Sequence, residues 1–425
     1  HYGISTRKVY THTGWRKIGG ELHYIHAGGA ITAHGARDDL AVDLPDPRYR
    51  LPAPPAPPEL REAVRATLRL VDLSTAQPGI GAVQLARIAA PPLAPWVRLD
   101  WGVFVVGRTG CLKTELAALA MAHYGQFHAR ALPGSWESSE GALLLQAHAV
   151  KDALFEIDDF NPSGAAHDQA QLGKKADRVF RGAANAAGRE RLTADIRLRR
   201  GQHPRGLVSA SGEDLPPGRS LRARLWTVEL DVGSIDLPKL TACQRDAAQG
   251  VYRQSLAGYL QWLAGRADDL GAKLPTRYET LRTQAPEALR AHGRIPSNLA
   301  GLTVALETFI TFAVDVGALE SDEAHALLVR LVGALQAQAK NQANIQDQSE
   351  DATRFMEMLR AAFATGRAHL VNAERWPTSR EPLTCAAHLG WRGHVRAKGD
   401  PETGPRYEPL GEMIGYVEGT SDEVW

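Results

Sequence analysis

The stretch V-F-V-V-G-R-T-G-C-L-K-T, residues 103–114, decides the fold that we expect for this chain. An apolar run ends at Gly107, and Lys113 and Thr114 stand directly before a segment with the apolar spacing of a helix. A glycine-containing loop between a strand and a helix, closed by lysine and threonine, is the pattern of a phosphate-binding loop. Such a loop turns backbone N–H groups toward phosphate oxygens at a helix N-terminus, where the helix dipole favours anions.

The loop departs from the usual pattern because Leu112 stands where a glycine normally precedes the lysine. Gly110 supplies flexibility two residues earlier, and a leucine is tolerable if its side chain points away from the phosphates. We expect Lys113 to place a charge near the β and γ phosphates of ATP, and Thr114 to bind Mg²⁺. The alternative is a chance glycine turn of the kind that any α/β protein contains. The residues expected to hold the nucleotide are Gly107, Arg108, Thr109, Gly110, Cys111, Leu112, Lys113 and Thr114.

A second motif, A-L-F-E-I-D-D-F at residues 153–160, places two acids at the end of an apolar strand. A Walker B strand delivers a Mg²⁺ ligand beside a phosphate-binding loop in this way. We expect Asp158 to join the Mg²⁺ shell and Asp159 to orient or polarise the attacking water. The alternative is that two acids end the strand because the chain meets solvent there.

Strand-like and helix-like runs alternate between about residues 99 and 235, which predicts a mostly parallel sheet between helices. The expected fold class is α/β: a P-loop ATPase core with an N-terminal β-rich subdomain and a C-terminal helical region that could end in a winged helix. Prolines in the segment 44–58 predict an extended linker that separates the N-terminal strands from the core. The expected divisions are an N-terminal subdomain with linker (1–57), the nucleotide-binding core (58–238), a helical lid with connecting helices (239–350), and a helix-plus-wing region (351–425).

The composition is that of an ordinary globular chain, with 425 residues, 44% hydrophobic residues and a net charge of +1. Three separated cysteines favour a reduced, cytoplasmic setting. We see neither a signal peptide nor an apolar run approaching the ~20 residues of a membrane span, and a chain running from His1 to Trp425 reads as a piece of a longer or processed protein. His12, His23 and His26 lack a partner cysteine or acidic cluster, so we interpret them as strand residues rather than metal ligands.

Two further groups of polar residues follow the Walker B motif. Ser211 ends L-V-S-A-S, expected to be a strand between the two motif strands, and is the candidate sensor of bound nucleotide, with Ser209 second. Arg224, and after it Arg222, precede the next strand, where an arginine in ring ATPases reaches the neighbouring subunit's nucleotide. A plain turn and a solvated basic turn are the respective alternatives.

These motifs together resemble the AAA+ proteins of phages, plasmids, integrative elements and staphylococcal-type cassettes that are regarded as helicases. The resemblance covers most of the chain and rests on H-T-G-W-R, G-R-T-G-C-L-K-T-E-L-A-A-L-A, L-P-G-S-W, K-D-A-L-F-E-I-D-D-F-N-P, S-G-E-D-L-P and L-G-W-R. That family and the related MCM-type replicative helicases frequently lack the glycine before the lysine. The usual Walker B pair is Asp-Glu, so Asp158-Asp159 leaves the water-activating role less defined. The resemblance implies a hexameric, ATP-driven DNA helicase used in mobile-element replication, with an arginine finger acting in trans.

The segment 174–205 is the expected DNA contact, because it holds ten Lys or Arg and three acids. In MCM-like ATPases a hairpin projects into the ring channel from this position. We expect I-R-L-R-R-G-Q-H-P-R to form it, with its tip near Gly201 and Gln202, and with Arg199, Arg200 and His203 touching DNA. Arg189 and Arg191 could instead contact the neighbouring subunit, and a solvated charged surface is the general alternative.

Other functions share the nucleotide motifs. The first is a non-helicase AAA+ ATPase that loads or remodels another protein, and the second is a monomeric P-loop nucleotide-binding protein or kinase. Arg245 could be a second sensor or plain surface, and the C-terminal region could bind DNA or serve in packing. We expect Trp376 and Trp391 to be core residues.

Overall fold

The computed structural model describes residues 8–163, 165–186, 191–192, 198–199, 201–290, 293–372, 389–394 and 406–417. The chain forms two compact units that divide between Ala343 and Asn344. The first contains both motifs expected to bind the nucleotide, residues 103–114 and 153–160.

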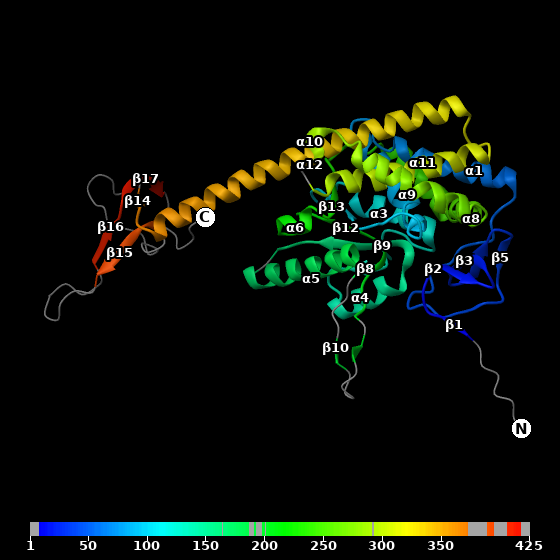
Figure 1. Cartoon of the computed structure of the whole chain (residues 1–425), viewed down its shortest axis with the longest axis horizontal. Coiled ribbons are helices and arrows are strands. Elements are labelled where there is room, and N and C mark those ends of the chain that lie inside the picture. Colours follow the sequence, from blue (N-terminus) through cyan, green and yellow to red (C-terminus); the bar gives the residue numbers. More distant parts are fainter. Residues whose placement is uncertain are drawn as a thin grey trace, which may run out of the picture. The chain divides into compact units, whose positions relative to one another are not determined.

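A five-stranded parallel sheet organises the first unit (Figure 1). Every pairing between neighbouring strands of this sheet is parallel, as the sequence predicts. The strand order is β13 (Leu225–Glu229), β7 (Gly102–Val106), β12 (Arg205–Gly212), β9 (Lys151–Phe160) and β8 (Gly134–Ser135). The mixed α/β class is therefore confirmed.

Side chains alternate between the two faces of this sheet, and each face meets different helices. On β7, Phe104 lies 6.4 Å, ring to ring, from Phe180 of α5 (Ala166–Asn185). Ser209 of β12 is on the other face and contacts Arg87 of α2 (Pro78–Ala89). The helix that follows the loop, α3 (Lys113–Tyr124), packs on this second face, whereas α4 (Glu140–Ala149) lies with α5.

A small antiparallel sheet forms the N-terminal part of the same unit. It consists of β2 (Gly14–Ile18), β3 (Glu21–His26), β4 (Gly29–Thr32) and β5 (Gly35–Arg37), and β1 (Val9–Tyr10) pairs separately with β6 (Ala41–Val42). A hairpin joins β2 to β3, and Gly19 and Gly20 turn the chain there with φ of 59° and 94°. These are values that glycine adopts without steric cost.

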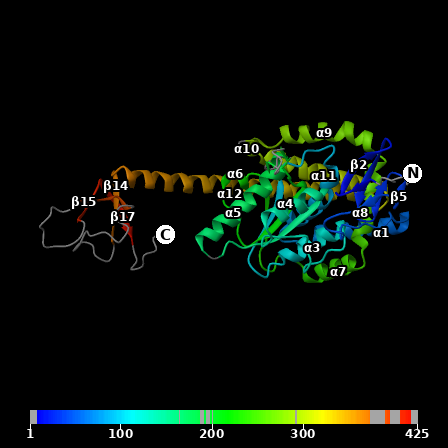
Figure 2. The same ribbon diagram turned by 90° about the horizontal axis from the view of Figure 1, so that it is seen from below.

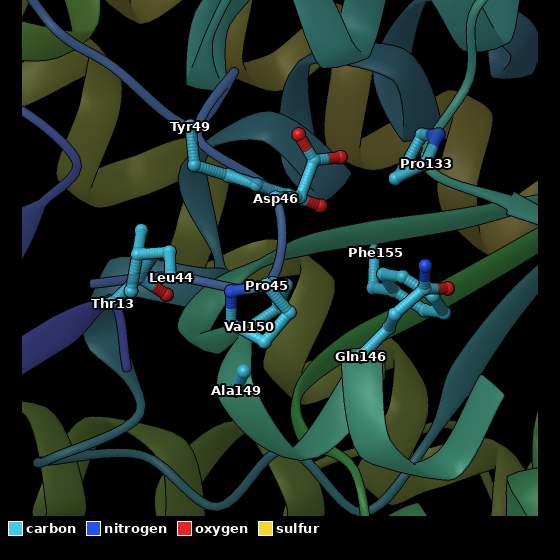
Figure 3. Close-up of a pocket in the computed structure, with 10 residues that line it drawn as sticks. All are labelled: Thr13, Leu44, Pro45, Asp46, Tyr49, Pro133, Gln146, Ala149, Val150 and Phe155. Atoms are coloured by element: carbon cyan, nitrogen blue, oxygen red, sulfur yellow. The ribbon is translucent and has the colours of Figure 1, made fainter. Parts of the chain in front are cut away.

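The proline-rich segment is extended but does not separate the N-terminal strands from the core, contrary to expectation. Tyr49 and Leu51 within it are buried, and the Tyr49 hydroxyl donates to the Leu154 carbonyl at 2.9 Å. The Trp15 indole donates to the Pro92 carbonyl at 2.8 Å. Figure 3 shows where this segment packs against α4 and β9, and a cavity of about 10 Å³ remains between them. That volume admits about one water molecule. The N-terminal strands are thus packed onto the core.

Helices complete the first unit (Figure 2), and the expectation of a helical region after residue 240 is confirmed. They include α1 (Pro57–Leu68), α7 (Leu237–Ala248), α8 (Val251–Ala264), α9 (Ala267–Thr283), α10 (Glu287–Arg290) and α11 (Ile295–Asp315), with the 3-10 turns Arg69–Asp72 and Pro91–Leu93. Helix α12 (Ser321–Ala364) begins in this unit and continues past its boundary at Ala343.

Helix α11 corrects the expectation about apolar runs. It is 21 residues long, with a mean hydropathy of 1.4 over its most apolar 18 residues, which is enough to cross a membrane by length and composition alone. Yet 78% of that window is buried inside the protein, which is the environment of a core helix.

The second unit contains the end of α12 and two strand pairs. β14 (Ala368–Asn372) pairs in parallel with β17 (Glu412–Val417), and β15 (Trp391–His394) pairs antiparallel with β16 (Arg406–Pro409). Trp391 is a core residue, as predicted: it packs with Val371 and Leu389, and its indole donates to the Leu370 carbonyl at 2.8 Å. Trp376 lies outside the described residues, and a winged helix stays a prediction.

Candidate functional site

The order of the strands brings the two sequence motifs together. β12 lies between β7 and β9, and the carboxyl ends of parallel strands meet at one edge of a sheet. The loop after β7 therefore lies beside Asp158 at the end of β9 and Ser211 at the end of β12.

The loop is held by its neighbours along this edge. The Gly107 N–H donates to the Gly212 carbonyl at 3.2 Å. A Cβ at position 107 would lie 2.5 Å from the Leu230 carbonyl oxygen, so the glycine is required by close approach of the backbone. Gly110 adopts a φ of 86°. Glycine at these two positions therefore has a local structural reason.

Leu112 has a left-handed conformation, with φ of 69° and ψ of 24°, directly before α3 begins. This is the region that glycine enters freely and that other residues enter at a cost, so the backbone here has the form that the usual glycine would give. The leucine side chain is half-buried and packs against the hydrophobic core. The substitution thus changes the side chain without changing the turn.

The remaining loop residues surround a strongly polar edge. The Lys113 ammonium donates to the Gly107 carbonyl at 2.6 Å and to the Arg108 carbonyl at 3.0 Å, so it lies back over the loop. The Thr109 hydroxyl donates to Glu213, and Cys111 is buried. The described loop therefore exposes Arg108, Thr109 and Gly110 to solvent.

The oxygens of Thr114, Asp158 and Ser211 converge. The Thr114 hydroxyl lies 3.4 Å from Asp158 Oδ1, and the Ser211 hydroxyl donates to the same oxygen. A hydroxyl beside a carboxylate is a donor set suited to Mg²⁺, which prefers oxygen ligands and keeps several waters. The chain thus offers Thr114 and Asp158 as the residues that fit a magnesium ion.

Asp159 sits in an irregular part of the sheet. The register passes from Ala210 opposite Ile157 to Gly212 opposite Phe160, so two acids stand where the partner strand has one residue. Asp159 is exposed and left-handed, with φ of 64°. Its carboxylate is available to solvent at the edge that carries the loop.

Ser209, the second candidate sensor, lies in a buried polar cluster rather than with Asp158. Its hydroxyl accepts from Arg87 at 3.0 Å, and Arg87 also contacts Glu156. Burial raises the pKa of Glu156 to about 7, although the Arg87 guanidinium opposes the rise. Sequence reasoning missed Arg87 and Glu156; the available signal was a charged residue inside an apolar helix and another inside an apolar strand.

Arg224 lies at the amino-terminal end of β7, whereas the loop follows the carboxyl-terminal end of that strand. Its carbonyl accepts from the N–H of Gly102, the first residue of β7, whereas the loop follows the last residue, Val106. At ~3.3 Å per strand residue the two positions are separated by roughly 13 Å or more. The Arg224 Nε atom is buried and has no hydrogen-bond partner in the part of the chain that the structure describes. Burial, followed by the charges of Arg294 and Arg181, lowers the pKa of this guanidinium.

The other predicted arginines have different surroundings. Arg222 Nε donates to the Pro216 carbonyl at 3.0 Å. Arg245 on α7 is exposed, and it is Gln244 that donates to Glu115 of α3, at 2.8 Å. The helix α7 therefore contacts α3 one residue beyond Thr114, through an amide rather than a guanidinium.

A two-stranded ribbon precedes β12, but its position differs from the prediction (Figure 1). β10 (Arg191–Leu192) pairs antiparallel with β11 (Leu198–Arg199), and Arg191 faces Arg199. The turn therefore falls before β11, and a tip near Gly201 and Gln202 is wrong. Arg200 lies outside the described residues, and for Arg199 the structure describes the backbone alone.

His203 lies at the base of the ribbon instead of its tip. Its carbonyl accepts from His148 Nδ1 at 2.9 Å, and the two rings lie 5.7 Å apart. Burial lowers the pKa of both histidines. His203 is half-buried, and its contact with DNA stays a prediction.

Part of the basic segment is engaged within the fold. Lys175 donates to the carbonyls of Trp136 and Ser138, each at 2.8 Å. Arg178 pairs with Glu140, and Arg181 pairs with Asp177. These cations hold α5 and its surroundings together, which leaves the ribbon as the candidate nucleic-acid contact.

The histidines near the N-terminus have structural partners. His26 Nδ1 accepts from the N–H groups of Gly28 and Leu51, at 3.1 and 3.3 Å, which requires a neutral ring. Burial, with a smaller effect of Arg50, lowers its pKa to about 4. His23 is buried, and His12 lies against the Thr13 carbonyl at 2.8 Å.

Comparison with known proteins gives a fold. No family model and no curated protein sequence matches the chain. Among solved structures, "SCCmec type IV Cch - active helicase" is similar with a TM-score of 0.54 and 12% identity, covering 89% of this chain and 67% of that one. At this identity the likeness shows a shared fold. The C-terminal region of NrS-1 (TM-score 0.31, 10% identity, 81% and 78% coverage) and a JCV helicase (0.30, 13%, 57% and 65%) match less well.

Proposed function

We propose that this chain is a Mg²⁺-dependent ATPase that forms a ring, translocates on DNA and unwinds it, in the replication of a mobile element or phage. The observation that carries the proposal is the meeting of Thr114, Asp158 and Ser211 at one sheet edge beside the loop that ends in Lys113. The solved structure that shares the fold is described as an active helicase, which supports the same reading.

Each residue at this edge has a role in phosphoryl transfer. Lys113 leaves the carbonyls of Gly107 and Arg108 and binds β and γ phosphate oxygens, while the loop N–H groups bind the same phosphates. Thr114 and Asp158 hold Mg²⁺, which neutralises charge that develops on the phosphates. Ser211 fixes the orientation of the Asp158 carboxylate by donating to it. Asp159, exposed at the same edge, orients the attacking water.

The position of Arg224 favours an assembly. Arg224 lies at the amino-terminal end of the strands, and Lys113 lies at their carboxyl-terminal end, so Arg224 cannot reach the nucleotide of its own chain. A second copy that places its Arg224 edge against the first copy's loop supplies that charge in trans, and repetition of this head-to-tail contact closes a ring, which we propose to be a hexamer. Arg222, turned toward Pro216, is the weaker candidate.

DNA contact is assigned to the ribbon of β10 and β11. The described backbone brings Arg191 opposite Arg199, and Arg200 is the next residue in the sequence, so this short segment combines three arginines. Arginines there bind phosphates without reading sequence. His203 is left out of this assignment because it packs at the base of the ribbon.

ATP hydrolysis with and without single-stranded DNA tests the proposal. We expect DNA to stimulate the wild type, Lys113→Ala to abolish turnover, and Arg199→Ala/Arg200→Ala to lose the stimulation alone. The control is Arg16→Ala/Lys17→Ala, which removes the same charge from exposed positions of β2 and should keep the stimulation. Hydrolysis without DNA stimulation would indicate a loading or remodelling ATPase. A permanent monomer without hydrolysis would indicate a P-loop nucleotide-binding protein, and a monomer that transfers phosphate to a small acceptor would indicate a kinase.

A further inference from the structure

A second pair of polar side chains lies directly beneath the metal-binding pair. Ser209 is the register partner of Glu156, and each stands two residues before Ser211 and Asp158, respectively. Residues two apart on a strand share a face of the sheet. Both pairs therefore face the helix that follows the loop. Ser211 and Asp158 lie near the carboxyl-terminal ends of their strands, and Ser209 and Glu156 lie two residues earlier, inside the sheet.

Arg87 joins this inner pair to the rest of the face. It is 1% exposed, and its Nη1 atom donates to Glu156 Oε2 at 3.3 Å and to the Ser209 hydroxyl at 3.0 Å. Its Nη2 atom donates to the Leu116 carbonyl at 2.9 Å. Leu116 belongs to the first turn of α3, two residues after Thr114.

Gln84, one helical turn before Arg87, holds the guanidinium in this position. Its Oε1 atom accepts from Arg87 Nε at 3.0 Å and from Nη2 at 2.6 Å. Its Nε2 atom donates to the same Leu116 carbonyl at 2.8 Å. The planar guanidinium thus spans α2, α3, β9 and β12 at once, which the single nitrogen of a lysine cannot do.

Stability alone is a weak reason for such an arrangement. Taking both charges of a salt bridge out of water carries a desolvation cost that well-packed apolar residues avoid. Glu156 is fully buried, and its Oε1 atom has no partner among the described residues, so the carboxylate is not even completely satisfied. What the contacts do provide is a fixed spacing between the helix that carries Thr114 and the strands that carry Asp158 and Ser211.

We infer that Arg87 is a positioning residue, which holds α3 against β9 and β12 so that Thr114 and Asp158 stay close enough to share one metal ion. The inference rests on the proposed function. Displacements of about 1 Å in a reacting geometry can cost roughly 100-fold in rate while binding survives. The effect of losing Arg87 should therefore appear mainly in turnover.

The test compares Arg87→Lys with the wild type in nucleotide affinity, kcat and thermal midpoint. Lysine keeps the charge opposite Glu156 but gives up the simultaneous contacts to Ser209, Gln84 and Leu116. We expect the affinity for an ATP analogue to stay within about threefold and kcat to fall by roughly tenfold to 100-fold. The control is Ser255→Ala, which loses a buried hydrogen bond from Thr67 (2.9 Å) away from the sheet and should keep the wild-type kcat.

A second variant, Arg87→Met/Glu156→Leu, keeps the test decisive if the lysine variant folds poorly. It removes both charges together, so the fold should persist while kcat still falls. Wild-type kcat in either folded variant would overturn the inference and leave the proposed function intact. The same conclusion would follow if Ser255→Ala, at an equal loss of thermal stability, lowered kcat as much as the Arg87 variants do. Absence of hydrolysis in the wild type would refute the proposed function and the inference together.

Discussion

Leu112 provides a direct test of the loop's backbone conformation. At this position glycine should make the protein more stable than alanine does, whereas inside a helix the order of stability is the reverse. Its φ of 69° lies in the left-handed region, where a Cβ atom costs roughly 1–2 kcal/mol. Its side chain is half-buried against the core. Replacing it therefore changes two quantities, backbone strain and apolar contact, that the two substitutions separate.

Leu112→Ala keeps the strain and loses half-buried carbon atoms, which at ~0.8 kcal/mol per buried CH₂ costs about 1 kcal/mol. Leu112→Gly loses the same contacts but relieves the strain. The extra conformational freedom of glycine in the unfolded chain lowers the free energy of unfolding by about 0.4–1 kcal/mol, which offsets part of that gain. Glycine should thus be more stable than alanine by about 0.5 kcal/mol. At Ala170, exposed in α5, Ala→Gly should instead cost ~1 kcal/mol.

Denaturant unfolding of the wild type and the three variants measures these differences. If Leu112→Gly is less stable than Leu112→Ala by about the amount that the Ala170 substitution costs, then the left-handed backbone at position 112 carries no strain. Leu112→Gly should also bind ATP with wild-type affinity, because the turn already has the shape that glycine adopts.

Two other substitutions and one change of pH test separate parts of the structure. Gly107→Ala places a Cβ 2.5 Å from the Leu230 carbonyl, so it should cost about 1–3 kcal/mol by denaturant unfolding and weaken ATP binding at least about tenfold. His26 has a pKa of about 4 in the folded protein and 6.5 in the unfolded chain, so the unfolded chain binds more protons between these two pH values. The free energy of unfolding should therefore fall by about 3 kcal/mol from pH 7 to pH 4. Trp15→Phe leaves the Pro92 carbonyl without its donor and should cost about 1–3 kcal/mol in the same unfolding experiment.

The first two of these have a matched control, and the third has an outcome that would contradict it. Gly141 lies in α4 with open space around its Cβ position, so Gly141→Ala should stabilise slightly; equal loss from both glycine substitutions would contradict the close-approach argument. His26→Gln can accept the same hydrogen bonds without titrating, and an acid loss as large as in the wild type would exclude His26 as the cause. For Trp15→Phe, unchanged stability would mean that the N-terminal strands do not depend on this contact.

The features that could be predicted from the sequence are mostly those specified by a few neighbouring residues. The loop, its flanking strand and helix, and the acids at the end of β9 are each encoded by a few adjacent residues, such as Gly107 followed by Lys113. Their meeting in space follows from the rule that parallel strands end at one edge. The sequence alone therefore suffices to bring the proposed metal ligands into one neighbourhood.

Pairing and packing were harder to predict. Gly201 and Gln202 have the composition of a turn, but the register of a short ribbon depends on pairing that no single residue specifies, and the turn falls earlier. Prolines correctly indicated an extended segment, yet the burial of Tyr49 depends on a surface of β9 that is distant in sequence. The buried contacts of Arg87 likewise join residues from four elements, and only the isolated charge in an apolar helix pointed to them.

The proposed function depends on Thr114 and Asp158 holding one metal ion beside the phosphates bound at Lys113. Anomalous diffraction from crystals grown with Mn²⁺ and a non-hydrolysable ATP analogue locates that ion directly. We expect a single strong peak between the Thr114 hydroxyl and the Asp158 carboxylate, with the β and γ phosphates against Lys113. A peak elsewhere, or phosphates bound away from the loop, would mean that these residues do not form the proposed site.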